Sequence, residues 1–164
     1  MQLLQLIAWL VYGSLTLTAF FVVLVALFPR RLARTRAVAE GMPGRSMLVG
    51  IINLIFFSAV IVALVALNQW TGARLFVLPA VAVLAVLLAA AAFGLGGVVE
   101  LVGERLLPQS TGIRRTVAGT LALGWACALP ILGWFGLLPL VVAFGLGAFI
   151  LSLFSQTAPA AAAA

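Results

Sequence analysis

Long stretches without a charged side chain dominate this sequence and limit what it can fold into. Three of them, residues 3–28, 46–67 and 75–99, contain no Asp, Glu, Lys or Arg. Each is as long as, or longer than, the roughly 20 residues that a helix needs to cross a bilayer. The chain is 66% hydrophobic and 7% charged, whereas soluble domains carry roughly 25% charged residues. Because the runs are continuous and do not alternate, we predict membrane-spanning α-helices and not a barrel.

A fourth uncharged stretch, residues 116–154, is too long for a single crossing. As one straight helix its 39 residues would measure about 58 Å, nearly twice the hydrocarbon thickness of about 30 Å. Two prolines and two glycines between Pro130 and Pro139 predict a tight hairpin at its middle. The two legs are each near or below the usual minimum of about 17 residues. Whether the hairpin crosses the bilayer fully therefore stays open.

These runs predict one all-α domain, a polytopic transmembrane helix bundle over residues 1–154 with three full spans plus a short C-terminal helical hairpin. Five helical elements are expected, at about residues 3–28, 46–67, 75–99, 117–132 and 138–154. The Ala-rich residues 155–164 form a low-complexity tail, which we expect to be disordered or ordered only by a partner.

The placement of arginine predicts an orientation. The net charge of +6 combines nine basic and three acidic residues, and most of the arginines lie in residues 29–45 and 100–115. Positive residues are retained on the cytoplasmic side of a membrane. We therefore expect a bacterial cytoplasmic (inner) membrane protein with its N-terminus outside and its C-terminus in the cytoplasm. Residues 29–45 are expected to be a loop, because the sequence Gly41-Met42-Pro43-Gly44 is typical of a helix break.

Aromatic residues give a separate check on this topology, because Trp and Tyr prefer the boundary between membrane and water. Trp9, Tyr12, Trp70 and Trp134 fall near the outer ends of the predicted helices. Trp125 falls near the middle of the predicted helix 117–132, where a packing or hydrogen-bonding role is expected.

Glycine spacing is the strongest local signal. The segments Phe93-Gly94-Leu95-Gly96-Gly97 and Phe144-Gly145-Leu146-Gly147-Ala148 share a short pattern of small residues. Small residues let helices approach closely, and in lipid this packing takes the place of the hydrophobic driving force. We predict helix packing at Gly94, Gly96, Gly97, Gly145 and Gly147. The alternative is a groove lined by these glycines for a bound lipid, quinone or carotenoid, although the sequence predicts no cofactor outright.

Two groups of charged residues are candidate contact sites. Glu100 and Glu104 share one face of a helix end, where like charges need a nearby cation, so an interfacial salt-bridge cluster is expected. Its members are Glu100, Glu104, Arg105, Arg114 and Arg115. Arginines nearer the N-terminus match the geometry of phosphate and are expected either to contact lipid head groups or to act only as topology signals. These are Arg30, Arg31, Arg34, Arg36 and Arg45.

The usual residues of catalytic and metal sites are missing from the sequence. There is no histidine, the commonest metal ligand and proton shuttle, and the single cysteine, Cys127, lies within an apolar run. Glutamate occurs only in the predicted loops or at their boundaries, so no nucleophile and base are paired and no ionisable group is expected at bilayer depth. No basic soluble domain is present for nucleic acid. We expect no enzyme, no metal and no nucleic acid, and membrane lipids and other membrane subunits, or a second copy, as partners.

The closing hairpin resembles a known bacterial membrane module. The resemblance rests on Ala128-Leu129-Pro130-Ile131-Leu132-Gly133-Trp134 followed by Gly145-Leu146-Gly147-Ala148. This is similar to the Leu/Gly-rich Pro-x-x-Gly-Trp module of uncharacterised bacterial membrane proteins, some of them associated with the bactofilin (polymer-forming cytoskeletal) group. It covers about a quarter of the chain, and the β-helical polymerising domain of bactofilins is not among these residues. The resemblance implies a bacterial inner membrane and scaffolding, and it assigns no catalytic residue.

The absence of catalytic residues and the abundance of packing signals favour one hypothesis of function. It is a non-catalytic integral membrane subunit or scaffold that packs against itself or against a larger membrane complex. The alternative is a small channel or carrier for a neutral or lipidic solute. That alternative requires a polar-lined path, for which Asn53 and Glu100 are candidate residues.

Overall fold

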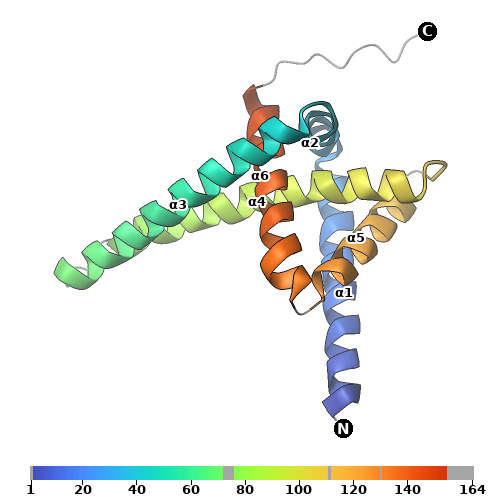
Figure 1. Cartoon of the computed structure of the whole chain (residues 1–164), viewed down its shortest axis with the longest axis horizontal. Coiled ribbons are helices and arrows are strands. Elements are labelled where there is room, and N and C mark those ends of the chain that lie inside the picture. The colour runs from blue at the N-terminus through green and yellow to red at the C-terminus, as the bar shows by residue number, and fades with distance from the viewer. Residues whose placement is uncertain (1, 72–75, 111, 130, 155–164) are drawn as a thin grey trace.

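The computed structural model describes residues 2–71, 76–110, 112–129 and 131–154, with side chains for Gln5 and from Val11 onward (Figure 1). These residues are almost entirely helical and include no strand, which confirms the predicted all-α fold. The elements are α1 (Gln2–Leu27), α2 (Pro29–Gly41), α3 (Pro43–Thr71), α4 (Val77–Leu106), α5 (Ile113–Cys127), the π-helical turn η2 (Leu132–Leu137) and α6 (Leu138–Phe154). The predicted tail at 155–164 lies outside the described residues.

Three helical segments of the described residues are long and apolar enough to cross a membrane. They are α3, α4 and the continuous segment Leu132–Phe154, and they make this chain a membrane protein. A fourth is counted if α1 and α2 are taken as one broken span. The span predicted over residues 3–28 lies partly outside the residues whose side chains are described.

The segment expected to be a loop, residues 29–45, is mostly the helix α2. Phe28 and Met42 have non-helical backbones, and each precedes a proline that begins the next helix. A residue before proline avoids the α conformation, while proline suits the first turn of a helix, where no N–H is needed. Each break is therefore one residue long. At Phe28 the chain bends by 103° between Val11–Leu27 and α2.

Helix α4 continues beyond the end predicted for it at residue 99. It includes Glu100, Glu104 and Arg105 and ends at Leu106, just before the Leu107-Pro108 pair that disfavours a further helical turn. Its 30 residues correspond to about 45 Å, so α4 is longer than the hydrocarbon core is thick.

The C-terminal hairpin is less symmetrical than the sequence predicts. Helix α5 begins early, after Gly112 with its positive φ of 65°, and has only 15 residues. It ends at Cys127 instead of residue 132, since Pro130 disfavours a helical conformation at the residue before it. The second leg, Leu132–Phe154, has 23 residues and begins with η2, which continues directly into α6. One leg of the hairpin is therefore long enough to span a bilayer.

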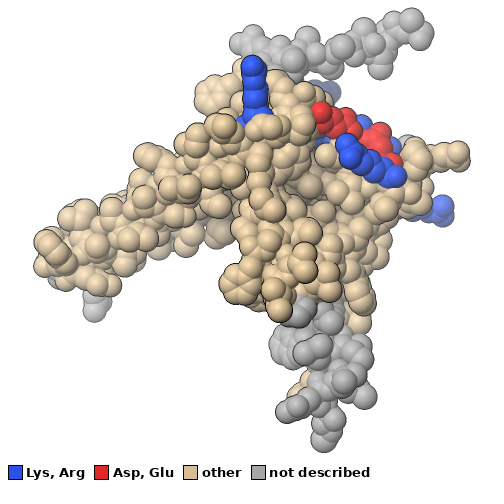
Figure 2. Space-filling view, viewed as in Figure 1, with Lys and Arg blue, Asp and Glu red and all other residues tan. Residues whose placement is uncertain are grey.

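The helices form a body from which two long helices project. The outer halves of α3 and α4, residues 51–71 and 77–90, extend away from α1, α5 and α6 (Figure 1), and we call these outer halves the arm. In the most apolar 18-residue stretch of α3, 6% of the residues are buried, against 33% in the corresponding stretch of Leu132–Phe154. The charged side chains visible in Figure 2 gather on one side of the body, and the arm shows almost none.

Helix α6 packs between α3 and α4 and forms the centre of the body. Phe93 of α4 stacks on Phe149 of α6, with ring centroids 5.4 Å apart, and meets Phe28 edge to face at 5.1 Å. Leu146 and Ala148 of α6 are fully buried. Aromatic pairs of this kind contribute about 0.5 to 1.5 kcal/mol beyond their buried area, so they help to hold α4 against α6 and the bend at Phe28.

Candidate functional site

The closest helix contact joins α6 to the start of α3 through four small residues. Ala143 and Gly147 on α6 face Ser46 and Gly50 on α3, each pair being four residues apart. A Cβ atom added at Gly147 would overlap the Ser46 carbonyl oxygen and lie 2.6 Å from the Gly50 nitrogen. Backbone meets backbone here, which is the packing that small residues permit in lipid.

A second close contact joins α6 to α4 on its other side. A Cβ atom at Gly145 would lie 2.7 Å from the Gly94 carbonyl carbon and 2.9 Å from the Leu95 nitrogen. Gly94 in turn faces the Gly145 backbone. The two Phe-Gly-Leu-Gly segments noticed in the sequence therefore meet each other at this crossing.

Helix α4 carries three further glycines at close contacts towards its end. Gly96 lies under the Leu32 side chain and Gly97 under that of Thr35, so α2 packs onto this part of α4. Gly103 of α4 faces the Arg115 carbonyl of α5, and Gly119 of α5 faces the Val99 carbonyl. Helix α4 therefore makes close contacts with three helices, α2, α5 and α6.

The five glycines singled out in the sequence are all buried at these contacts. Neighbouring chain atoms occupy the space beside them, so they line no open groove for a cofactor. Sequence analysis missed the partners Ser46, Gly50, Gly103 and Gly119. A signal for the first two was present in the four-residue spacing of Ser46 and Gly50, which is that of a small-residue packing motif.

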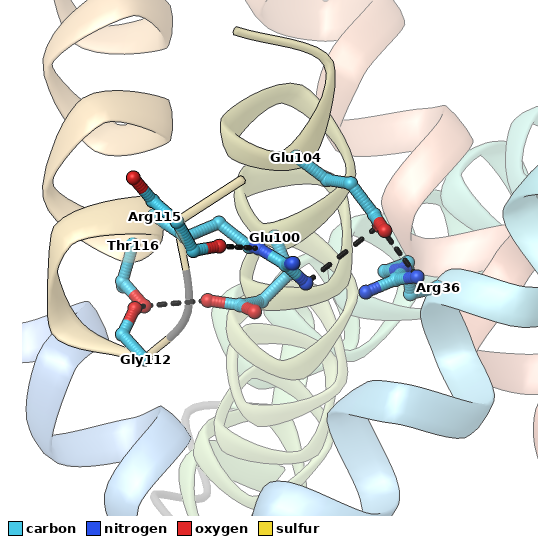
Figure 3. A network of polar contacts seen from close by, with 7 residues as sticks. Arg36, Glu100, Glu104, Gly112, Arg115 and Thr116 are labelled. Carbon is cyan, nitrogen blue, oxygen red and sulfur yellow. Dashed lines mark hydrogen bonds and ion pairs between the residues drawn. The ribbon is translucent and has the colours of Figure 1, made fainter. Parts of the chain in front are cut away.

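A polar cluster joins α2, α4 and α5 at the charged side of the body, as Figure 3 shows. We define it as Arg36, Glu100, Glu104, Arg115 and Thr116. Glu104 lies 2.5 Å from Arg36 and 3.7 Å from Arg115. The hydroxyl of Thr116, which is 1% exposed, donates to a Glu100 oxygen at 2.5 Å. The Arg115 Nε donates to the Ser110 carbonyl at 3.2 Å.

This cluster neutralises its own charges. Two arginines balance two glutamates, and both glutamates have a donor or cation partner. The side chains of Arg36 and Glu104 are 26% and 31% exposed, so their ion pair contributes at most about 1 kcal/mol to stability. The arrangement links three helices.

The salt-bridge cluster predicted from the sequence differs in membership from the one in the structure. Arg105 and Arg114 are exposed, and no ion pair joins either of them to another described residue. Arg36 takes their place, because α2 is a helix and its packed face brings residue 36 beside Glu104. The sequence analysis treated residues 29–45 as a loop and therefore could not predict the ion pair between Arg36 and Glu104.

The remaining arginines of the N-terminal group lie on the outer surface. Arg30, Arg31, Arg34 and Arg45 are exposed, while Leu32, Thr35, Val38 and Ala39 form the buried face of α2. Helix α2 is therefore amphipathic, with one face packed on α4 and α6 and with Arg30, Arg31 and Arg34 exposed, while Arg45 lies in the first turn of α3. Such a helix suits a membrane surface, and contact with lipid head groups stays a prediction for these four arginines.

A cavity of about 200 Å³ lies between α1, α4, α5 and α6. Thr120 and Cys127 are among the lining residues, but no nitrogen or oxygen atom of the described residues is exposed to the cavity. Thr120 donates its proton to the Thr116 carbonyl at 2.8 Å. The lining residues are Leu17, Phe21, Leu95, Val99, Thr120, Leu123, Gly124, Cys127, Leu138, Val141 and Val142.

Trp125 does not have the packing role that its predicted mid-helix position suggested. It is 60% exposed and lies two residues before the end of α5. The difference follows from the early end of α5 at Cys127. Trp70 and Trp134 are also exposed, at 91% and 66%, whereas the side chain of Trp9 lies outside the described residues.

No protein-family model, curated protein or solved structure matches this chain. The class that the fold defines is an all-α membrane protein with several close glycine crossings and one polar cluster. Within the described residues no group of three His, Cys, Asp or Glu side chains is placed to hold a metal ion.

Proposed function

We propose that this chain is a non-catalytic membrane subunit or scaffold that associates through its arm with a second copy or with another membrane protein. The observation that carries the proposal is the position of the arm, whose two apolar helices leave the body and bury little surface within the chain. Lipid chains alone could cover these apolar side chains. What favours a protein partner is the kind of residue that the arm exposes.

Small residues form an exposed stripe on both helices of the arm. On α3 the stripe consists of Ala59, Ala63 and Ala66, and on α4 of Ala82, Ala85 and Ala89. Their spacings of three and four residues keep each stripe on one helix face. Faces of small residues allow another helix to approach closely, which is a main source of association in lipid. Inside this chain the same kind of face already joins α6 to α3.

A bulkier stripe should weaken the association. We expect the variant with both Ala63→Leu and Ala85→Leu to lose at least about tenfold in association, equivalent to about 1.4 kcal/mol. The mass of the complex in mild detergent, measured by light scattering after size exclusion, gives the readout. The matched control carries Val65→Leu and Val77→Leu, which lie on the same helices, are exposed and point away from the stripes.

The wild-type chain decides whether the proposal stands. A co-purifying copy or partner that is lost in the alanine variant and retained in the valine control supports it. A lipid-bound monomer from the wild type, with nothing co-purifying, contradicts it. The alternative of a channel or carrier gains little support, since Asn53 donates its amide to the Val49 carbonyl of its own helix at 2.8 Å and does not line the cavity.

We also propose the bacterial inner membrane as the location, with the N-terminus outside and α2 on the cytoplasmic side. The exposed arginines of α2 support this orientation. In a Cys127→Ala background, a cysteine at the exposed positions 34 or 37 should react with an impermeant maleimide only after cells are opened. Labelling of either position in intact cells would reverse the orientation. The resemblance of the closing hairpin to a bactofilin-associated module stays a prediction.

A further inference from the structure

We propose that the cavity between α1, α4, α5 and α6 is a binding site for one acyl chain of a phospholipid from the surrounding bilayer. This site is separate from the arm, so it does not depend on the proposed function. Its walls come from two crossing helix pairs, with Leu17 and Phe21 of α1 on one side and Leu138 and Val141 of α6 on another.

The chemistry of the walls selects a hydrocarbon. The cavity of about 200 Å³ exposes no nitrogen or oxygen atom of its lining residues, and apolar sites of this kind bind apolar molecules. A quinone or another ligand with a polar head would need hydrogen-bond partners inside the site. The only hydroxyl proton there, on Thr120, is already donated to the Thr116 carbonyl. An acyl chain makes no such demand.

The cavity opens onto the apolar surface of the body. Two of its lining side chains, Leu17 of α1 and Leu138 of α6, are themselves exposed, at 42% and 43%. The polar cluster borders the cavity at one end, since Glu100 follows Val99 directly on α4 and Thr116 lies one turn before Thr120 on α5. A lipid chain would enter past the exposed side chains of Leu17 and Leu138, away from that end.

Gly124 provides a way to fill the cavity without disturbing its walls. A Cβ atom added at Gly124 would meet only the Leu17 Cδ2, at 3.9 Å, an ordinary van der Waals distance. The variant Gly124→Leu therefore places a leucine side chain in the space that the acyl chain would occupy. Val141→Phe fills the same space from the α6 side. A matched control is Ala19→Leu, because Ala19 is exposed and lies on the face of α1 opposite to Leu17 and Phe21.

The test uses the full chain in nanodiscs of phosphatidylcholine in which some acyl chains carry a photoreactive diazirine. After irradiation, mass spectrometry locates the cross-linked peptides. We expect wild type and Ala19→Leu to be cross-linked within residues 120–127 and 138–142, and Gly124→Leu to lose these cross-links while keeping those on the arm.

Each result bears on the proposal directly. Loss of the cavity cross-links in both Gly124→Leu and Val141→Phe supports an acyl chain in the site. Cavity peptides labelled no more than the arm in wild type, or labelling that survives both filling variants, would overturn it. Should Gly124→Leu fail to fold, Gly124→Ala and Val141→Phe give the same comparison.

Discussion

Replacing Gly147 with alanine is expected to destabilise the body at least as much as most other single methyl additions, Gly50→Ala being comparable. The added Cβ atom would overlap the Ser46 carbonyl oxygen and approach the Gly50 nitrogen to 2.6 Å. Both obstacles are backbone atoms of α3, so relief requires α3 and α6 to separate. Overpacking in a closely packed interior typically costs about 1 to 3 kcal/mol and sometimes more, and we expect the upper end here. Unfolding in detergent, followed by tryptophan fluorescence, measures the loss.

Gly44→Ala is the control for this experiment. Gly44 lies in the first turn of α3, near Ser46, and a Cβ atom there meets nothing within 4 Å. Because alanine is a better helix former than glycine by up to about 1 kcal/mol, this variant should be as stable as the wild type or slightly more stable. Equal stability of Gly147→Ala and Gly44→Ala would show that α3 and α6 do not cross at these residues.

Replacing Leu32 with alanine is expected to have the second largest effect. Leu32 is 1% exposed, and its Cδ2 lies 2.7 Å from the position of a Cβ atom at Gly96. Removing a buried leucine side chain costs about 2 to 5 kcal/mol in soluble cores. We expect the lower half of this range, because burying a leucine side chain gains less free energy when the alternative surroundings are lipid instead of water. Detergent unfolding measures it, with Leu48→Ala, at a position 59% exposed, as the control.

A double-mutant cycle with Gly96, which faces Leu32, tests this contact more directly. Gly96→Ala alone should strain the contact with Leu32, whereas in the Leu32→Ala chain the new methyl group enters vacated space. The two changes together should therefore cost less than the sum of the single changes, by about 0.5 to 3 kcal/mol for residues in contact. Strict additivity would mean that α2 does not pack on α4 at Gly96.

The helical content of the chain was predictable, but the role of its prolines was less so. The uncharged runs marked the positions of α3, α4 and the last segment, because run length and continuity reflect the thickness and apolar nature of a bilayer. The pairs Phe28-Pro29 and Met42-Pro43 were taken as parts of a loop. In the structure each proline begins a helix, because a proline that ends one helix also suits the first turn of another.

The contact sites were predictable only in part, for a related reason. The spacing of Gly94, Gly96 and Gly97 indicated packing surfaces. Spacing shows which face of a helix packs, but it does not show which other helix packs on that face. The same limit applies to Arg36, which was assigned to the membrane surface and pairs with Glu104 instead. Its pairing depends on the bend at Phe28 and on the close approach of α2 to α4.

By itself, the sequence determined that this chain is a helical membrane protein, because such long uncharged runs can satisfy their backbone groups in lipid only as helices. Only the tertiary structure decided which small residues meet, that α6 lies between α3 and α4, and that an apolar cavity remains beside Gly124. Association in lipid depends on shape and not on hydrophobicity, and shape arises only when the helices are placed together.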